Sequence, residues 1–406
     1  MPGELRVTDL RRADRALVVL SDIEMGPGGD TDDFPGTSWL ASLLLEYNRG
    51  RWADVPLDVV FNGDTFDLLK IPVDGRFVHH VDAAVALAKM RAVIAAHPWF
   101  FAGIRELLAH READRRVWFV VGNHDFELLF PEVQALIRAT VGHPAIEFPG
   151  FEVDFGDVHI EHGSQADGLF RIEPEQPFIH WQGQEILNLP WAAVALVDVG
   201  MPLHDVLYPC DRARPMARVL RLLPEIRALL LDRYWQYWTR DWLAAWWAAS
   251  DPFKQVSWTL FRQVATRLQS GDPAVKLDAH LGERVAAGPH RVVLQGHLHD
   301  PSWHHLGTNK LLRTGCMRDE FLLGEDGSIG PVIPKVYAEI LLEGGHAFRS
   351  QLVEVDPDPG TPAATMPASI LDVLERVRDR LAPNDTHNEQ AAQLETESVH
   401  PQSLGR

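Results

Sequence analysis

The chain has 406 residues, of which 46% are hydrophobic, and its formal net charge at pH 7 is −19. The hydrophobic content excludes a wholly disordered chain, and the length predicts either one large domain with an insertion or two domains. The negative charge argues against an extended nucleic-acid-binding face, because such a field repels polyanions.

The cysteines and the N-terminus bear on the cellular compartment. The two cysteines, Cys210 and Cys316, are far apart in the sequence and have no metal-ligand spacing, which is typical of a reduced interior. The N-terminus lacks a basic segment followed by an apolar one, so no signal peptide is expected. The apolar stretch 186–199 is too short and too interrupted to span a bilayer, and we expect a cytoplasmic protein without a transmembrane segment.

The first half of the chain alternates between predicted strands and helices. Apolar runs at 16–20, 57–61 and 117–121 predict three buried strands. Each is followed by a stretch with helical character, and these stretches are 38–48, 80–110 (broken near Pro98) and 126–141. Later strands are predicted at 151–155, 158–161, 291–295, 310–313, 336–342 and 351–355. This order predicts an α/β protein with a mixed sheet, or two sheets face to face, and helices outside.

Residues 165–290 interrupt this pattern, and we expect them to be helical and without strands. Apolar residues between 218 and 247 recur at three- and four-residue steps, and seven aromatic residues lie between Tyr234 and Trp247. Two interpretations are open: a helical hairpin that packs on the core, or a face that lines a groove for an apolar group such as an acyl chain. Residues 357–406 are rich in polar residues and proline and are predicted to form a largely disordered tail, with one amphipathic helix at 370–381.

Polar side chains follow five of the predicted strands. Such loops, at the carboxyl ends of strands in a helix-covered sheet, are where chemistry is usually done. One loop alone could be an ordinary turn, but five are unlikely to arise by coincidence. Carboxylate, amide and imidazole groups without a thiolate favour Mn, Fe, Zn, Co or Mg, and a two-metal hydrolytic site needs about this many ligands. The residues are Asp22 and Glu24; Asp64 and Asp67; Asn123, His124 and Asp125; His162; and His297 and His299.

The order and local sequence of these loops resemble those of the calcineurin-like metallophosphoesterase family. The strings that carry the resemblance are Asp22-Ile23-Glu24, Gly63-Asp64-Thr65-Phe66-Asp67, Gly122-Asn123-His124-Asp125, His162 and Gly296-His297-Leu298-His299. The resemblance implies a four-layer αββα sandwich of two mixed β-sheets flanked by helices. It also implies a discontinuous core formed by 1–164 and 291–356, with 165–290 as a helical, aromatic-rich insertion over the site.

The same resemblance implies a role for each residue. Asp22 and His299 would bind a first divalent metal, Asp64 would bridge two metals, and Asn123, His162 and His297 would bind the second. His124 would be the general acid, and Asp125 would orient its ring. The metals would be two divalent ions, with Mn²⁺ expected first and Fe, Zn, Co or Mg as alternatives.

Glu24 departs from the family pattern, which has a histidine at this position. Glutamate is a competent hard ligand, so we expect Glu24 to bind the first metal and to shift its preference toward Mn or Mg. The alternative is that Glu24 points away and the first metal is weak or absent. We expect Asp67 to support a ligand rather than bind a metal. Four histidines are expected to lie at the surface: His79, His80, His304 and His305. Asp30, Asp32 and Asp33 are expected to form a solvated acidic loop near the mouth of the site, and the alternative is that they contact the residues that support the ligands.

The function implied is dinuclear-metal-dependent hydrolysis of a phosphoester or pyrophosphate bond by a metal-bridging hydroxide. The substrate would be a small phosphorylated molecule. It could carry an acyl chain or be linked to a nucleotide. The segment from Phe61 to Asp67 and the string His162-Gly163-Ser164 are similar to the branch that cleaves the pyrophosphate of UDP-2,3-diacylglucosamine. The alternatives are a nucleotide or nucleic-acid phosphodiesterase and an inactive binding protein that keeps the fold.

Overall fold

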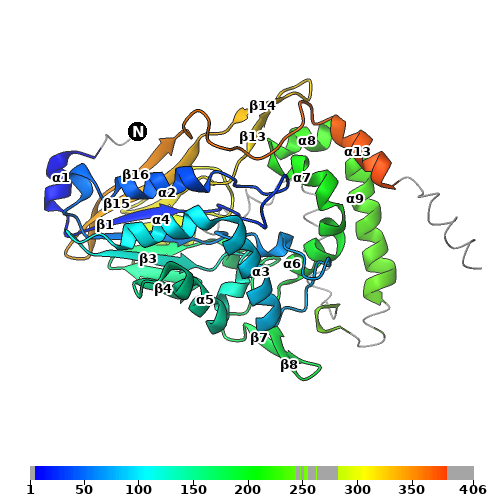
Figure 1. Ribbon diagram of the computed structural model, residues 1–406, viewed down its shortest axis with the longest axis horizontal. Coiled ribbons are helices and arrows are strands. Elements are labelled where there is room, and N and C mark those ends of the chain that lie inside the picture. Colours follow the sequence, from blue (N-terminus) through cyan, green and yellow to red (C-terminus); the bar gives the residue numbers. More distant parts are fainter. Residues whose placement is uncertain (1–4, 244–246, 248–250, 255–261, 263–281, 382–406) are drawn as a thin grey trace, which may run out of the picture.

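A computed structural model describes residues 5–243, 247, 251–254, 262 and 282–381 (Figure 1). Its largest element is a six-stranded mixed sheet in which four parallel strands are followed by two antiparallel ones at one edge. The strands, in spatial order, are β16 (His346–Val355), β15 (Lys335–Glu343), β1 (Arg15–Leu20), β2 (Leu57–Asn62), β3 (Arg115–Val120) and β4 (Ile146–Gly150). The predicted strands at 16–20, 57–61 and 117–121 are therefore confirmed.

A second mixed sheet of five strands faces the first. Its three inner strands are parallel, and an antiparallel strand flanks them on each side. The strands, in spatial order, are β11 (Ser302–Leu306), β12 (Asn309–Arg313), β10 (Val292–Gln295), β6 (Val158–Glu161) and β5 (Glu152–Phe155). The prediction of two mixed sheets flanked by helices is confirmed.

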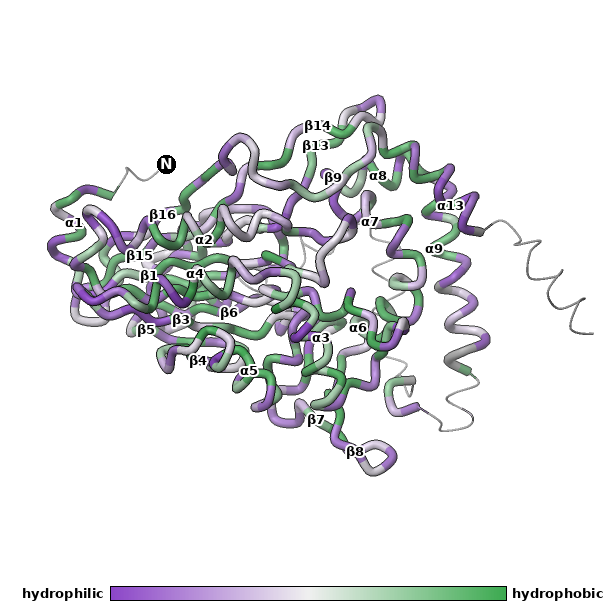
Figure 2. Tube along the Cα trace, in the orientation of Figure 1, coloured by the Kyte–Doolittle hydropathy of each residue, from purple (hydrophilic) through white to green (hydrophobic). Residues whose placement is uncertain are grey.

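The two faces of β1 show how the sheets are buried. Leu17 and Val19 pack between the two sheets, against residues such as Ile160 and Leu294 of the second sheet. Val18 and Leu20 point to the opposite face, into the layer of helices. Successive side chains of a strand alternate between faces, so an uninterrupted apolar strand is the pattern expected where both faces are covered. Figure 2 shows this apolar character along the central strands.

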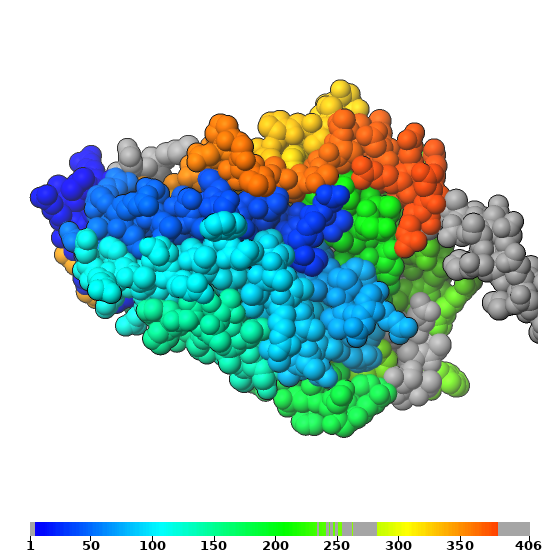
Figure 3. All heavy atoms as spheres, viewed as in Figure 1, coloured from blue at the N-terminus to red at the C-terminus, as the bar shows by residue number. Residues whose placement is uncertain are grey.

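The helices on the outer face of the six-stranded sheet begin and end where the sequence indicates. Five helices precede β4: α1 (Val7–Arg12), α2 (Thr37–Glu46), α3 (Ala83–Ala96), α4 (Pro98–Leu108) and α5 (Pro131–Val141). The side chain of Asp82 accepts a hydrogen bond from Val85 N and caps α3. The expected break near Pro98 is present, because proline occupies the first position of α4 and His97 is not helical. Together α2, α3 and α4 cover much of the face seen in Figure 3.

Residues 165–290 contain strands, contrary to the expectation. The strands β7 (Phe178–Trp181) and β8 (Gln184–Leu187) form a hairpin whose turn, Gln182-Gly183, has positive φ at both residues. Two such residues between short apolar runs are typical of a tight hairpin, and that signal in the sequence was missed. A further short strand, β9 (Ala213–Arg214), pairs with β13 (Phe321–Leu323), which in turn pairs with β14 (Ile329–Val332). The helices described in this region include α6 (Trp191–Ala195), α7 (His204–Arg212), α8 (Met216–Leu222) and α9 (Pro224–Gln236).

The region that was expected to be a tail is packed over its first part. The helix α13 (Asp372–Leu381) and the residue Ile370 share an apolar cluster with Val206 of α7 and Ile226 of α9. Figure 3 shows this last segment against the residues of the α7–α9 region. The prediction of an amphipathic helix at 370–381 is confirmed, and this helix is packed on the rest of the chain. The prediction for 382–406 lies outside the described residues.

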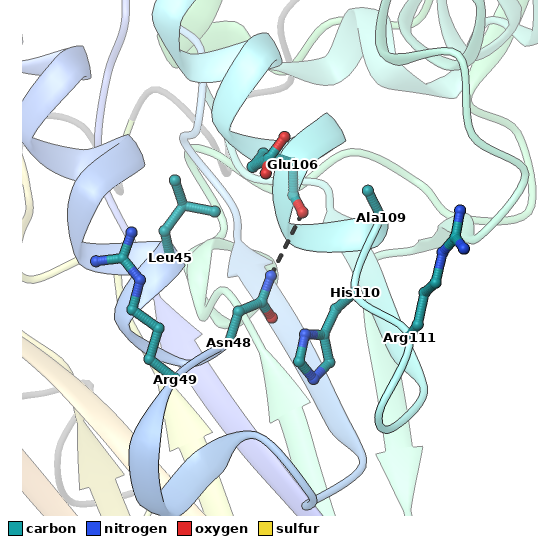
Figure 4. A pocket seen from close by; sticks show the side chains of 7 residues that line it. All are labelled: Leu45, Asn48, Arg49, Glu106, Ala109, His110 and Arg111. Atoms are coloured by element: carbon teal, nitrogen blue, oxygen red, sulfur yellow. Dashed lines mark hydrogen bonds between the residues drawn. The ribbon is translucent and has the colours of Figure 1, made fainter.

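Two further features concern the surface. No helix among the described residues is long and apolar enough to cross a bilayer. A hollow of about 280 Å³ lies between α2 and α4, where Asn48 Nδ2 donates to the carbonyl oxygen of Glu106 (3.4 Å) (Figure 4). It is at the amino ends of β2 and β3, opposite to the loops that carry the predicted ligands.

Candidate metal centre

The predicted ligands come from loops at the carboxyl ends of parallel strands in both sheets. Asp22, Asp64 and Asn123 follow β1, β2 and β3 of the six-stranded sheet. His162 and His297 follow β6 and β10 of the five-stranded sheet. Parallel strands end at a common edge, so the packing of the two sheets brings the five loops together. The carboxylates, Asn123 and His162 are buried, whereas His297 and His299 are partly exposed.

The backbone is held in an unusual conformation at most of these positions. Among the described residues other than glycine, seven have a positive φ, and five of those seven are predicted metal ligands. Each such residue costs of order 1 kcal/mol or more and persists only where the surrounding structure determines it. A concentration of backbone strain in one group of polar residues is typical of a functional site. The five are Asp22, Glu24, Asp64, His297 and His299, with φ between 49° and 68°.

One group of ligand atoms surrounds the ring of His162. Its Nδ1 donates to the carbonyl oxygen of Asn62 (2.9 Å), which leaves Nε2 as the free nitrogen. That Nε2 lies 3.1 Å from Asp64 Oδ2 and 3.2 Å from Asn123 Oδ1. Asp64, His162 and His297 each offer an atom, and the three atoms lie within 4.8 Å of one another. A nitrogen lone pair that faces oxygen acceptors requires a positive charge between them, either a proton or a metal ion.

A second group surrounds His299 in the same manner. The Nδ1 of His299 is 2.7 Å from Glu320 Oε1, and its Nε2 is 3.2 Å from Asp22 Oδ1 and 3.5 Å from Glu24 Oε1. Asp22, Glu24 and His299 form the second set of atoms within 4.8 Å. The two sets are adjacent, since Asp22 Oδ1 is 3.9 Å from His162 Nε2. Two adjacent clusters of His, Asp and Glu side chains that could hold divalent cations are therefore present.

The charge states of the rings reflect these surroundings. Burial lowers the pKa of His162, but the carboxylates of Asp64 and Asp22 outweigh it and raise the pKa to about 9. Burial and the neighbouring His162 lower the pKa of His297 to about 4, so this ring is neutral at pH 7. A neutral imidazole has the lone pair that metal binding needs.

Glu24 does not point away from the site. Its Oε1 faces His299, and its Oε2 accepts from Arg318 Nη1 (2.7 Å) and lies 3.5 Å from Lys70 Nζ. Burial raises the pKa of Glu24, and Arg318 and Lys70 oppose that rise. Oε2 of Glu24 is thus held by the side chains of Arg318 and Lys70, and Oε1 is directed at His299.

The cations around Glu24 belong to a larger buried network that the sequence did not reveal. Lys70 Nζ also contacts Asp33 (2.5 Å), Asp67 (2.7 Å) and Asp211 (3.2 Å). Arg212 Nε donates to Asp33 Oδ1 (2.5 Å). The expectation that the acidic loop is solvated is therefore wrong for Asp33 and also for Asp32, because both carboxylates are buried.

His124 is hydrogen bonded to a different carboxylate from the expected one. Its Nδ1 lies 3.0 Å from Asp67 Oδ1, whereas Asp125 accepts from the backbone N–H groups of Gly122 (2.7 Å) and Thr65 (2.8 Å). Asp125 is adjacent in sequence, but the tight turn directs its side chain back onto the loop. Burial lowers the pKa of His124, but Asp67 and Asp64 raise it to about 10. Asp67 therefore occupies the place beside the ring that was expected for Asp125.

A cavity of about 690 Å³ adjoins this network. Lys70 lines it, together with Arg76, His204 and Arg380 and apolar residues such as Phe77 and Met201. Because Lys70 also contacts Asp67 and Glu24, the cavity lies next to the candidate metal centre. Its wall is formed by residues 70–77 and by the region from 197 to 205.

Gly122 tests whether close packing of the loops positions the ligands. A Cβ added at this residue would lie 2.2 Å from Asp64 Oδ1 and 2.4 Å from Asp64 N, so Asp64 would have to move. We expect Gly122→Ala to weaken the binding of Mn²⁺ by about 10–100-fold, as when other groups that position a ligand are removed. Calorimetric titration measures this. Gly282→Ala is the matched control, because among the described residues its Cβ would meet only Leu306 Cδ2, at 3.8 Å. Equal affinities for the two variants would contradict the prediction.

Glu24 tests the charge balance around Arg318. In metal-free protein, Glu24→His should lower the free energy of unfolding by about 1–3 kcal/mol, since the buried guanidinium of Arg318 loses one of its charged acceptors. Urea denaturation measures the change, with the exposed Glu46→His as control. If Glu24→His were as stable as the parent chain, Arg318 would not depend on this carboxylate.

Comparison with known proteins adds little to this geometry. No protein-family model matches the chain, and no curated protein matches it. Among solved structures, the chain is similar to the phosphopantetheinyl hydrolase PptH from Mycobacterium tuberculosis, with 14% sequence identity and a TM-score of 0.25. The match covers 75% of this chain and 91% of that one. A TM-score this low carries no functional assignment.

Proposed function

We propose that the protein is a metal-dependent phosphohydrolase that cleaves a phosphoester or pyrophosphate bond in a small phosphorylated substrate. The observation that supports this most directly is the arrangement of His162 and His299. Each ring is held at Nδ1 and turns its Nε2 toward buried carboxylates at the strand ends. Two such groups side by side match the ligand set of a dinuclear hydrolytic site.

The donors fit two divalent ions. Asp22, Glu24 and His299 would hold one ion, and Asn123, His162 and His297 would hold the other, with Asp64 between them. Oxygen and imidazole donors suit Mn²⁺ best in our proposal, with Fe, Zn, Co and Mg as alternatives. When bound, such a pair supplies an activated water nucleophile at neutral pH and neutralises charge on the phosphoryl oxygens.

His124 is placed to protonate the leaving group. Its Nδ1 is hydrogen bonded to Asp67, which is in turn held by Lys70, so the ring has a fixed orientation and its Nε2 is the nitrogen left to donate. The carboxylates of Asp67 and Asp64 favour the protonated ring, which is the form that a general acid needs. Asp67 is a positioning residue in this proposal, and Asp125 shapes the loop.

The cavity beside Lys70 is the place that we propose for the rest of the substrate. It offers Arg76 and Arg380 together with apolar residues, which suits an anionic group attached to a less polar one. The aromatic residues of the insertion are partly used for packing, because Trp238 is buried and stacks on Trp191 (5.5 Å between ring centroids). An acylated or nucleotide-linked substrate, as in UDP-2,3-diacylglucosamine, is one member of the class that we propose.

Metal analysis and a simple hydrolysis assay test the proposed activity. The purified chain should contain divalent metal and should hydrolyse p-nitrophenyl phosphate or bis-p-nitrophenyl phosphate faster when Mn²⁺ is added. A preference for the bis ester would favour phosphodiester cleavage over phosphomonoester cleavage. A protein that retains less than about one metal per chain and hydrolyses neither ester would be the inactive binding protein instead.

The role of His124 predicts a dependence on the leaving group. We expect His124→Ala to retain its metals and to lose about 10²–10⁴-fold in kcat on substrates with poor leaving groups, with a smaller loss on p-nitrophenyl esters. Asp67→Asn should lower the pKa of His124 and so shift the alkaline limb of the pH–rate profile to lower pH, without loss of metal. His304→Ala, at an exposed histidine, is the control. Loss of metal from His124→Ala would show that the residue is structural.

A further inference from the structure

A second group of metal-binding side chains lies outside the candidate metal centre. His79 and His80 precede α3, and Asp198 lies in the π-helical turn Leu196–Gly200. Asp251 comes from a segment, 251–254, that is far from all three in sequence. The expectation that both histidines are surface residues is wrong, because they are partly buried against Asp251 and Phe253.

The ring of His79 repeats the arrangement of His299 at the candidate metal centre. Its Nδ1 lies 2.7 Å from Asp198 Oδ1, and its Nε2 lies 3.0 Å from Asp251 Oδ2. A carboxylate behind the ring and oxygen atoms in front of it are the surroundings of a histidine that binds a metal. The Nε2 of His80 faces the same carboxylate, at 3.5 Å from Asp251 Oδ1. This nitrogen is shielded from solvent and has no hydrogen-bond partner.

The distances match those between the ligands of one small ion. His79, His80 and Asp251 each offer one ligand atom, and the three atoms lie within 4.8 Å of one another. Adjacent ligands of a tetrahedral zinc ion, at about 2.0–2.1 Å from the metal, are about 3.3 Å apart. The Nε2 atoms of His79 and His80 lie 3.0 and 3.5 Å from different oxygens of the Asp251 carboxylate, Oδ2 and Oδ1, so both rings face this one side chain at about that separation.

Aromatic rings enclose the group. Phe253 presents its edge to His79 (5.9 Å between ring centroids) and lies 5.6 Å from His80. On another side, His80 is parallel to the indole of Trp181 in β7. An apolar enclosure of this kind limits access of water and strengthens the attraction between a cation and its ligands.

We propose that His79, His80 and Asp251 bind a Zn²⁺ ion, with Asp198 orienting His79 from behind. Two imidazoles and one carboxylate are a donor set that zinc accepts, with a fourth position left for water. The ion joins segment 251–254 to the loop before α3 and to the Leu196–Gly200 turn. Asp198 also lines the cavity beside Lys70, so the ion fixes part of the wall of that cavity. This site does not depend on the proposed phosphohydrolase activity.

Zinc analysis in a chain whose metal centre has been disabled tests the proposal. In the full chain with Asp22→Ala and Asp64→Ala, about one Zn²⁺ per chain should remain after dialysis. Adding His80→Ala should remove it, and adding Asp198→Asn should weaken its binding by about 10–100-fold. Substitution with Co²⁺ should give the strong visible absorption of a tetrahedral site, which is lost with His80→Ala. His180→Ala, at an exposed histidine of β7, should change nothing.

The otherwise unaltered chain provides a second measurement, in case the double variant fails to fold. There, His80→Ala should lower the zinc content by one ion per chain, and added ZnCl₂ should raise the Tm of the parent but raise it less in the variant. If His80→Ala leaves both the zinc content and the zinc-dependent Tm unchanged, the group is only a hydrogen-bonded pair of histidines and carboxylates. That result overturns the proposal and leaves the proposed phosphohydrolase untouched.

Discussion

Carboxylates are crowded together where the parallel strands of both sheets end, and the groups around them are placed by the need to balance that charge. Asp22, Glu24, Asp64 and Asp67 are all buried within a few residues of a strand end. Buried carboxylates without a compensating positive charge would be strongly destabilising. The protein supplies part of the balance through Lys70 and Arg318. The imidazole nitrogens that face Asp22 and Asp64 mark where the remaining positive charge belongs.

Glu24 shows how one buried negative charge is balanced by groups that are distant in the sequence. A neutral histidine at this position would need no partner, whereas a glutamate brings one more negative charge into the interior. Arg318 accommodates that charge, and it also binds Glu320, the carboxylate behind His299 (3.0 Å from Arg318 Nη2). The carboxylate of Glu24 is therefore linked to the loop after β12, which is 294 residues away in sequence at Arg318. A residue that departs from a sequence motif should be interpreted together with the charged groups that contact it in the fold.

The sequence predicted the parts of the molecule that follow from local pattern. Apolar runs located the central strands, and polar residues after those runs located the side chains that cluster at the strand ends, because both depend on neighbours in the chain. The partner of His124 could not be found in this way: Asp125 is next to it in sequence, but only the packing of two loops shows that Asp67 lies beside the ring. Arg318 and Glu320 follow β12 and obey the same rule as the ligands, so a closer reading of residues 314–320 could have identified them. Strand β4 was missed because Pro149 interrupts its apolar pattern, which an edge strand tolerates.

The small sheet of β9, β13 and β14 affects the order in which parts of the molecule can fold during synthesis. Ala213 pairs with Phe321, and the helix α7 that precedes it packs against Val373 and Val377 of α13. The wall of the cavity that contains His204 and Arg380 thus depends on residues separated by more than 150 positions. Domains fold as their residues emerge during synthesis, and contacts between distant segments must wait for the later one. The first three parallel strands are available early, but this wall of the cavity closes only when nearly the whole described chain has left the ribosome.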